Sequence, residues 1–519
     1  MRRALVVLAR VSACAQNGAP RRSLSRQLAV LLAVPLLAVA CGDEKVPRDL
    51  PASTPDAAAE GAKIVDAGCG PSAATAAAWS DWPSFSRDAK NSRFNADEKT
   101  LVAATVGKLA LTWSAETSGQ TGTPAAVDGV LYTGDAVGNI EARDAQSGCL
   151  IWQESLERTI TSSPLVTDTL VVVSDGKGYL TALARRDGSQ VWQTQVDSHP
   201  NVFLFSSPIL AETTIVTGVA STELNGLKDD YTFRGSIVGL EQTSGKELWR
   251  FYVTQNDATS GAGVSVWSSA AVDTVRKTLY IGTGQTYEEP ASPYADGVVA
   301  IDYTNGALRW HRQFTKDDVY TILKPLPKGP DADVGAAPNL FSIGARDVVG
   351  AGDKAGVYSV LDRDTGETVW ARQLTEGSSL GGVMVAAAYD GEALYLASNQ
   401  WVQEMGQIGA DFKDANNKTH VFALNPADGT NRWEIVVDTP TLGGVTVAGG
   451  VAYTSSADGM LRGLSTKDGS ELWKYKLEHG TASGHTVANG YLFVGDGFDF
   501  FAALANTPVP GKLYAFKLP

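Results

Sequence analysis

The stretch Asp144–Trp152, with the sequence DAQSGCLIW, is the first clear copy of a unit that recurs along the chain. In every copy a turn ends in Gly, and a Trp stands four residues after that Gly. The copies are Asp144–Trp152, Arg185–Trp192 (RRDGSQVW), Glu241–Trp249 (EQTSGKELW), Asp302–Trp310 (DYTNGALRW), Asp362–Trp370 (DRDTGETVW), Asn425–Trp433 (NPADGTNRW) and Ser465–Trp473 (STKDGSELW). Asp, Asn or Ser followed by Gly supplies the positive φ angles of a tight hairpin. Each copy is therefore expected to join two antiparallel strands.

The surrounding residues extend each copy to four strands. Two more apolar stretches precede each turn, for example Ala125–Val127 and Val130–Tyr132. An eighth Trp, Trp113, has no turn before it, and its missing partner lies at the other terminus, in residues 511–517. Eight four-stranded units predict an all-β, eight-bladed β-propeller in which each Trp docks on a neighbouring blade. Pairing of residues 511–517 with the strand at Trp113 would close the ring and hide both edges, which an open stack of sheets would not explain.

The spacing between the Trp residues locates the irregular blades. Successive Trp residues are 39 or 40 apart at both ends of the series, but 57 to 63 apart in units three to six. Units three to six therefore carry insertions.

The N-terminus is typical of an export signal. Arg21, Arg22 and Arg26 precede the apolar run Leu28–Ala40, which ends at Cys41. A run of about 13 residues is too short for a membrane-spanning helix and suits the core of a signal peptide. The small residues before Cys41 resemble the lipobox of bacterial lipoproteins, although an ordinary secretory signal with an incidental Cys is the alternative.

This interpretation divides the chain into three parts. Residues 1–40 are expected to be a lipoprotein signal peptide, residues 41–78 a lipidated Cys41 with a flexible Ala-, Pro- and Asp-rich linker, and residues 79–519 the propeller. We expect an exported protein with a periplasmic body that touches the membrane only through its lipid.

Charge and cysteine content exclude several classes of function. The net charge is −14, and because residues 1–40 hold six Arg and no acid, the rest carries −20. Such a body repels phosphate backbones, so nucleic-acid binding is not expected. Cys69 and Cys149 remain as a pair that could form a disulfide in an oxidising compartment. No C-x-x-C-H motif occurs, so we expect no haem attached to this chain.

Several runs resemble the quinoprotein alcohol dehydrogenases, which use pyrroloquinoline quinone (PQQ), and most of all polyvinyl-alcohol-dehydrogenase-like proteins. Beside the repeat, the resemblance rests on Trp82–Phe85 with Asn91–Phe94, Phe233–Ile237, Val266–Ser269 with Tyr280–Gly284, and Gly350–Gly356. The repeat by itself also occurs in non-catalytic propellers, such as the outer-membrane assembly lipoprotein.

The resemblance implies a cofactor site. Trp267 matches the Trp that forms the floor beneath the PQQ ring, and Lys354 matches the Lys or Arg that hydrogen-bonds the quinone oxygens. Glu223 falls where the family places a calcium-binding Glu, and Gln285 stands where the family has a calcium-binding Asn. The alternatives are a core aromatic for Trp267, an exposed turn residue for Lys354 and a solvated loop residue for Glu223.

The position of the catalytic base departs from the family. The resemblance implies an Asp eleven residues after the docking Trp310, but that residue is Thr321. Asp318, next to Asp317, aligns with an earlier Asp of the family pattern and is our predicted base. The alternative is that this acidic pair is a solvated part of a loop.

Two functions of different classes follow. The first is a PQQ- and Ca²⁺-dependent dehydrogenase that oxidises an alcohol, polymeric alcohols included, and passes electrons to a separate cytochrome c or other acceptor. The second is a non-catalytic lipoprotein that serves as a binding or assembly scaffold for envelope proteins. The insertions favour the first; Gln285, Thr321 and the absence of the family's Trp-Gly from Gly381–Ala386 favour the second. A weaker third idea is a glycan- or polymer-binding surface at the insert Gln400–Lys418.

Overall fold

The computed structural model describes residues 64–65, 69, 80–226, 230–323, 328–401, 416–498 and 509–519. Contacts divide the chain into Met1–Ala59 and Glu60–Pro519, and all described residues belong to the second unit. The predicted signal peptide, the lipidation site Cys41 and most of the linker lie outside the described residues.

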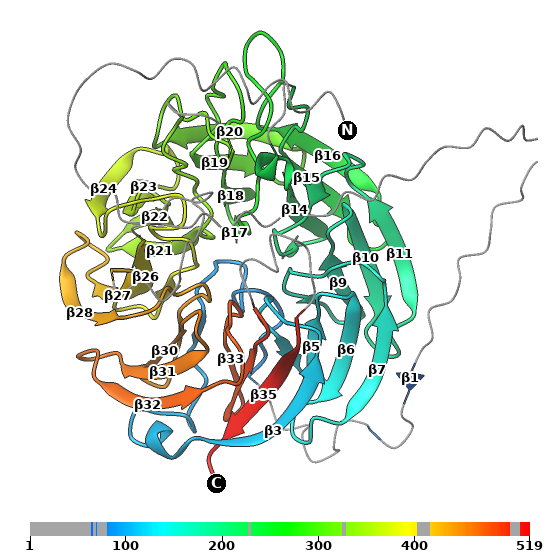
Figure 1. Ribbon diagram of the computed structural model, residues 1–519, viewed down its shortest axis with the longest axis vertical. Coiled ribbons are helices and arrows are strands. Elements are labelled where there is room, and N and C mark those ends of the chain that lie inside the picture. Colours follow the sequence, from blue (N-terminus) through cyan, green and yellow to red (C-terminus); the bar gives the residue numbers. More distant parts are fainter. Residues whose placement is uncertain are drawn as a thin grey trace, which may run out of the picture. The chain divides into compact units, whose positions relative to one another are not determined.

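Eight antiparallel sheets of four main strands surround a central axis, as the ring in Figure 1 shows. The prediction of an all-β, eight-bladed propeller is therefore confirmed. Blades 1 to 4 comprise β4 (Ala125–Val127), β5 (Val130–Gly134), β6 (Asn139–Asp144) and β7 (Leu150–Ser155); β8 (Leu165–Val166), β9 (Leu170–Ser174), β10 (Tyr179–Ala184) and β11 (Gln190–Gln195); β13 (Ile209–Ala211), β14 (Thr214–Ser221), β15 (Ser236–Glu241) and β16 (Glu247–Tyr252); and β17 (Ala271–Asp273), β18 (Thr278–Gly282), β19 (Gly297–Asp302) and β20 (Ala307–Gln313). Blades 5 to 8 comprise β21 (Asn339–Ile343), β22 (Arg346–Gly352), β23 (Val357–Asp362) and β24 (Thr368–Gln373); β25 (Ala388–Tyr389), β26 (Leu394–Gln400), β27 (Lys418–Leu424) and β28 (Asn431–Val437); β29 (Thr446–Ala448), β30 (Val451–Ser455), β31 (Met460–Ser465) and β32 (Glu471–Lys476); and β33 (Thr486–Ala488), β34 (Tyr491–Gly495), β35 (Gly511–Lys517) and β3 (Ala110–Thr117).

Short elements complete the fold. β1 (Ile64–Val65) pairs with β7, β2 (Phe94–Asn95) with β29, and β12 (Val202–Phe203) with β14. Within the described residues, 3-10 turns cover Val106–Lys108 and Glu223–Asn225. Cys69 and Cys149 form a disulfide, which settles a pairing that the sequence left open.

The two ends of the propeller close its ring. β3 pairs antiparallel with β35, with Trp113 opposite Ala515 and Thr117 opposite Gly511. Blade 8 thus combines one strand from the start of the propeller with three from its end, as predicted. The pairing satisfies the backbone groups of both terminal strands.

The recurring Trp docks each blade on the next. The Trp152 indole Nε1 donates to the Arg185 carbonyl at 3.1 Å, and a Cβ on Gly188 would lie 2.6 Å from the Trp152 ring. Gly188 therefore supplies both the positive φ of the turn (71°) and the flat surface beneath the ring. Equivalent Nε1–carbonyl bonds are made by Trp113, Trp192, Trp249, Trp310, Trp370, Trp433 and Trp473.

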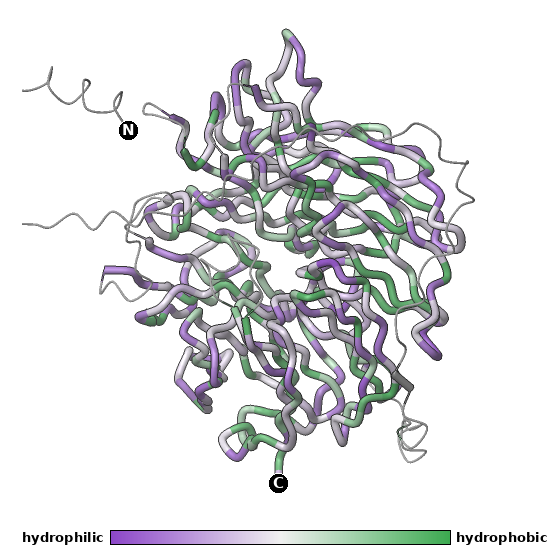
Figure 2. Tube along the Cα trace, turned by 45° about the vertical axis from the view of Figure 1, so that its right-hand side comes forward, coloured by the Kyte–Doolittle hydropathy of each residue, from purple (hydrophilic) through white to green (hydrophobic). Residues whose placement is uncertain are grey.

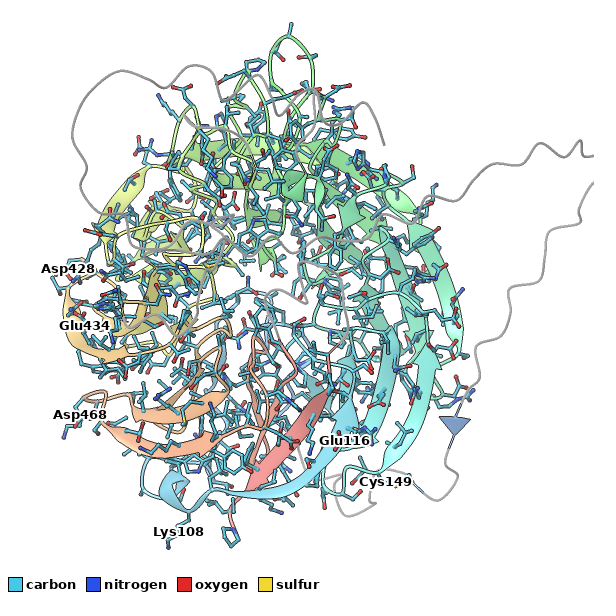
Figure 3. All side chains as sticks on the ribbon, viewed as in Figure 1. Lys108, Glu116, Cys149, Asp428, Glu434 and Asp468 are labelled. Carbon is cyan, nitrogen blue, oxygen red and sulfur yellow. A yellow bond between two sulfur atoms is a disulfide. The ribbon has the colours of Figure 1, made fainter. Side chains whose placement is uncertain are left out.

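The hydrophobic core lies between neighbouring sheets. Tyr132 and Trp152 of blade 1, for example, pack with Val171 and Val173 of blade 2. Figure 2 shows hydrophobic residues along the strands and hydrophilic residues in the peripheral turns. Asp428 and Asp468, from two of these turns, lie at the rim in Figure 3. In the part of the chain that the structure describes, no helix is long and apolar enough to cross a membrane.

The long insertions emerge on one face of the ring. Their described parts follow the second strand of a blade, as in residues 222–226, 230–235 and 283–296, or the fourth strand, as in residues 253–270, 314–323 and 328–338. Most of the predicted insert Gln400–Lys418 lies outside the described residues. Because consecutive strands are antiparallel, the ends of the second and fourth strands point the same way. Units three to six therefore build up a single face, which we call the insertion face.

Candidate functional site

All eight blades line a cavity of about 150 Å³ on the propeller axis, and each contributes one residue at an equivalent position. Each stands four residues before the first residue of its blade's inner strand. In blade order they are Thr121, Thr161, Phe205, Trp267, Gly335, Met384, Leu442 and Ala482. The largest of these side chains belongs to Trp267, which is half-buried at the wall of the cavity. Trp267 is thus a channel residue and lies outside the clusters of buried core residues, as the predicted cofactor floor requires.

Gly335 makes room for the Trp267 indole. A Cβ built on Gly335 would lie 1.7 Å from Cη2 and 1.9 Å from Cζ2 of Trp267. The six-membered ring of the indole therefore rests on the Gly335 backbone, in the next blade.

Asp333 links three of the predicted site residues. Its Oδ2 accepts from Trp267 Nε1 at 3.2 Å and from Lys354 Nζ at 2.8 Å. Its Oδ1 accepts from the backbone N–H of Gln285 at 2.7 Å. Asp333 is itself buried, with 3% of its surface exposed.

Lys354 is a buried cation between two carboxylates. Its Nζ also contacts Asp331 Oδ1 at 3.1 Å and lies 5.6 Å from the centre of the Trp267 ring. Burial alone would lower the pKa of Lys354, but Asp331 and Asp333 raise it above its ordinary value. The ammonium stays charged at neutral pH, and the alternative of an exposed turn lysine is wrong.

Asp318 lies buried beside this group. Its Oδ2 accepts from the Ala332 N–H at 2.7 Å and its Oδ1 from the Asp331 N–H at 3.3 Å. Burial raises the pKa of Asp318 to about 6, with the two amides opposing the rise and Asp333 adding to it. A carboxylate with this pKa can accept a proton near neutrality. The alternative of a solvated loop acid is wrong for Asp318.

Three buried carboxylate oxygens in this region lack hydrogen-bond partners: both oxygens of Asp296 and Oδ2 of Asp331. Both residues are fully buried. Burial, reinforced by the charges of Asp318, Asp333 and Asp331, raises the pKa of Asp296 well above its usual range. Asp331 and Asp333 contact Lys354 directly, and unpaired buried oxygens such as those of Asp296 and Asp331 fit a bound cation.

Glu223 and Gln285, the predicted calcium ligands, are both buried. The Glu223 carboxylate accepts from the Phe233 N–H at 2.9 Å and the Thr232 N–H at 3.3 Å, which anchors the insertion at residues 222–235. The Gln285 amide donates to the Tyr320 carbonyl at 3.4 Å. Glu223 is therefore not a solvated loop residue.

The metal-binding potential of the site depends on oxygens of several kinds. Within the described ranges, no three His, Cys, Asp or Glu side chains form a metal-binding group by themselves. The carboxylate of Glu223 and the amide of Gln285 offer oxygen ligands, which a hard cation such as Ca²⁺ prefers. Other oxygens would have to complete the coordination of the ion. The indole, the ammonium and the unpartnered carboxylate oxygens together fit a planar anionic quinone with a cation.

Thr321, at the family's position for the base, has a different role. It is fully buried, and its hydroxyl lies 3.2 Å from the Tyr231 hydroxyl.

The structure brings Trp267, Lys354, Gln285 and Asp318 together around Asp333 and Asp331.

Apart from Asp296, the site residues that sequence reasoning missed lie in one short stretch, Gly329–Gly335 (GPDADVG). Two acids at alternate positions, between a Pro and a Gly, are a signal that could have found them. Alternate residues of an extended segment point the same way.

Comparisons with known proteins agree with this architecture. A family model described as "Glucose/ethanol/alcohol dehydrogenase, beta-propeller domain" matches residues 195–376. A second, described as "Outer membrane protein assembly factor BamB", matches residues 97–230 and 353–489. Together the two models span most of the propeller.

Curated relatives include two proteins named polyvinylalcohol dehydrogenase. The one from Pseudomonas sp. is 29% identical over 430 residues, which cover 74% of this chain and 66% of the relative. The one from Sphingopyxis sp. is 26% identical and covers 68% of this chain and 59% of the relative. The chain thus spans less than two thirds of the length of these relatives.

Solved structures share the fold. The quinohemoprotein alcohol dehydrogenase ADHIIG from Pseudomonas putida superposes with a TM-score of 0.71 at 19% identity, covering 85% of this chain and 80% of that one. BamB from Moraxella catarrhalis gives a TM-score of 0.53 at 18% identity, covering 79% and 99%. By its repeat, its eight blades and these matches, the chain belongs to the PQQ-repeat β-propellers and is similar in sequence to PQQ-dependent (quinoprotein) alcohol dehydrogenases.

Proposed function

We propose that this protein is an exported dehydrogenase that oxidises an alcohol with PQQ and Ca²⁺ at the insertion face. The observation that carries the proposal is the linked group of Trp267, Asp333 and Lys354 at the channel wall, with the buried Asp318 beside it. An aromatic face, a fixed cation and a carboxylate of raised pKa are the parts that oxidation of an alcohol by a bound quinone requires.

Trp267, Lys354, Glu223 and Gln285 would hold the cofactor, and Glu223 and Gln285 would offer oxygens to the calcium ion. Bound PQQ supplies a two-electron acceptor for the hydride that leaves the alcohol carbon. Lys354, kept protonated by its two carboxylates, stabilises negative charge that develops above the Trp267 ring.

Asp318 takes the proton in this proposal. The alcohol O–H bond breaks as Asp318 accepts the proton, and the alcohol carbon becomes a carbonyl as its hydride departs. With a pKa of about 6, Asp318 is mostly ionised at pH 7 and yet basic enough to share a proton in the transition state.

The names of the relatives support a proposed class of substrate. Two of them are named polyvinylalcohol dehydrogenase, so polymers carrying secondary hydroxyls are the first substrates to test. Electrons would then leave to a separate cytochrome c or another acceptor. Cys41 is proposed as the lipid-anchored first residue of the mature protein, which mass spectrometry of its N-terminal peptide would test.

The test of the dehydrogenase is dye reduction by the protein reconstituted with PQQ and Ca²⁺, with polyvinyl alcohol and simple secondary alcohols as substrates. Turnover that requires both additions and is lost in Asp318→Asn supports the proposal. Reconstitution without turnover on any alcohol would contradict it.

A non-catalytic scaffold is the second candidate. The match of two segments to the BamB family model and the presence of Thr321 at the family's base position favour it. In that case capture experiments should return the same envelope proteins from wild-type protein and from Trp267→Ala.

A further inference from the structure

Trp267 and Gly335 are neighbours among the eight equivalent residues, one from each blade, that line the axial cavity. Among those eight residues the single Trp is followed, one blade on, by the single Gly. Any other residue at position 335 would place a Cβ within 2 Å of the indole carbons Cη2 and Cζ2. The backbone at Gly335 has no positive φ, so its need for glycine arises from the indole and not from the local conformation.

The second observation is that one carboxylate oxygen holds both the indole and the ammonium. Oδ2 of Asp333 accepts from Trp267 Nε1 at 3.2 Å and from Lys354 Nζ at 2.8 Å. The hydrogen bond to Nε1 restricts rotation of the ring, while Gly335 supports its opposite edge. The orientation of the aromatic surface and the position of the cation are therefore coupled through a single group.

Asp333 is itself oriented by two blades. Its Oδ1 accepts from the Gln285 N–H in blade 4, and its backbone carbonyl accepts from the Lys354 N–H in blade 5 at 3.0 Å. The next residue, Val334, donates its N–H to the Thr283 carbonyl at 3.0 Å. The side chain therefore has little freedom to move without disturbing both blades.

We propose that Asp333 and Gly335 are positioning residues that set the plane of Trp267 and the place of Lys354 for a planar anionic ligand. The identity of that ligand as PQQ rests on the proposed function, whereas the positioning of Trp267 does not. If Asp333 and Gly335 had only a structural role, their substitution would change only the stability of the protein. If they position Trp267, their substitution also changes the environment of that indole and the affinity for the ligand.

The test begins with the ligand-free protein labelled with 5-fluorotryptophan. Loss of one ¹⁹F resonance in Trp267→Phe identifies the signal of Trp267. Gly335→Ala and Asp333→Asn should each shift that resonance, because one displaces the ring and the other removes the charge beside Nε1. Gly107→Ala, on the far edge of blade 8 with an open surface and an ordinary φ, is the matched control and should leave it in place. An unshifted Trp267 signal in both folded variants would overturn the proposal, and if Gly335→Ala does not fold, Asp333→Asn decides.

The second arm measures affinity for PQQ with Ca²⁺ present by calorimetric titration. Loss of a charge-assisted contact predicts about tenfold or greater weakening of PQQ binding in Asp333→Asn, measured at a temperature at which the variant is folded. Unchanged affinity in both variants would overturn the role toward the cofactor. If the wild type itself binds no PQQ, the proposed function fails, while the ¹⁹F result still decides whether Asp333 and Gly335 position Trp267.

Discussion

Blades 1 and 2 and blades 4 and 5 share one strand pattern but use their buried aspartates differently. In blade 1, Asp135 accepts from the N–H groups of Val137 and Asn139, and in blade 2, Asp175 accepts from those of Lys177 and Tyr179. These acids close hairpins and are fully engaged.

In the insertions of blades 4 and 5, further buried acids lie near Lys354, and two of them have oxygens without hydrogen-bond partners. Asp296 and Asp331 have buried oxygens without partners, and Asp318 and Asp333 lie beside them. A protein tolerates such groups where a ligand or a proton completes them. Asp135 and Asp175 thus stabilise the repeat, whereas Asp296 and Asp331 have oxygens that could bind a ligand or a proton.

The largest expected effect separates Asp318 from Asp135. Asp318→Asn should lower turnover of the reconstituted enzyme by about 10²- to 10⁴-fold while PQQ still binds, because the proton acceptor is lost. Asp135→Asn should lower the thermal stability and leave turnover in place. Steady-state dye reduction beside calorimetric titration measures both, and full turnover in Asp318→Asn would remove Asp318 from the mechanism.

A second comparison sets the channel Trp267 against the docking Trp152. Trp152→Ala should cost about 3–5 kcal/mol of unfolding free energy, because it empties the contact between blades 1 and 2. Trp267→Ala should cost far less in the ligand-free protein but weaken PQQ binding by at least about tenfold, since the stacking surface is removed. Urea unfolding and titration give the two numbers. Equal losses of ligand-free stability would mean that Trp267 belongs to the core.

The pH dependence of stability offers a third test. The folded pKa of Asp318, about 6, lies above the unfolded value of about 3.9, so the folded state binds this proton more tightly. The free energy of unfolding of the ligand-free protein should therefore fall as the pH rises from about 4 to 6, because Asp318 loses its proton. The total loss from Asp318, reached above pH 6, should be about 3 kcal/mol. Asp318→Asn should remove that slope in urea unfolding series with EDTA present. A slope of the same size in the variant would show that Asp318 is not its source.

The smallest effect is expected at Thr321. Its hydroxyl bonds to Tyr231, so Thr321→Ala should cost about 1 kcal/mol of stability and leave turnover within about twofold. A large loss of turnover at unchanged stability would show that Thr321, at the family's base position, takes part in catalysis.

The fold could be predicted because its signal is local. A Gly four residues before a Trp encodes a hairpin and a docking contact, and both recur without reference to distant residues. The spacing of the Trp residues located the insertions. The one long-range pairing, of residues 511–517 with the strand at Trp113, could be predicted because the repeat leaves one incomplete unit at each end.

The candidate site could be predicted only in part. Trp267 and Lys354 stand in runs that resemble the family, but Asp333 acts through contacts with residues 48 and 66 positions away. Gly335 owes its role to the indole of the preceding blade, which no local pattern displays. The burial of Glu223, Asp318 and Lys354 could not be predicted from the sequence either, because charged residues in loops are usually solvated.

The central claim is that blades 4 and 5 form a quinone site. Calorimetric titration of the purified protein with PQQ, with and without Ca²⁺, tests it most directly. We predict one PQQ per chain and affinity that rises when Ca²⁺ is present, because the buried carboxylates need a cation beside an anionic ligand. Absence of binding in both conditions would contradict the claim and leave the insertion face as a surface for protein partners.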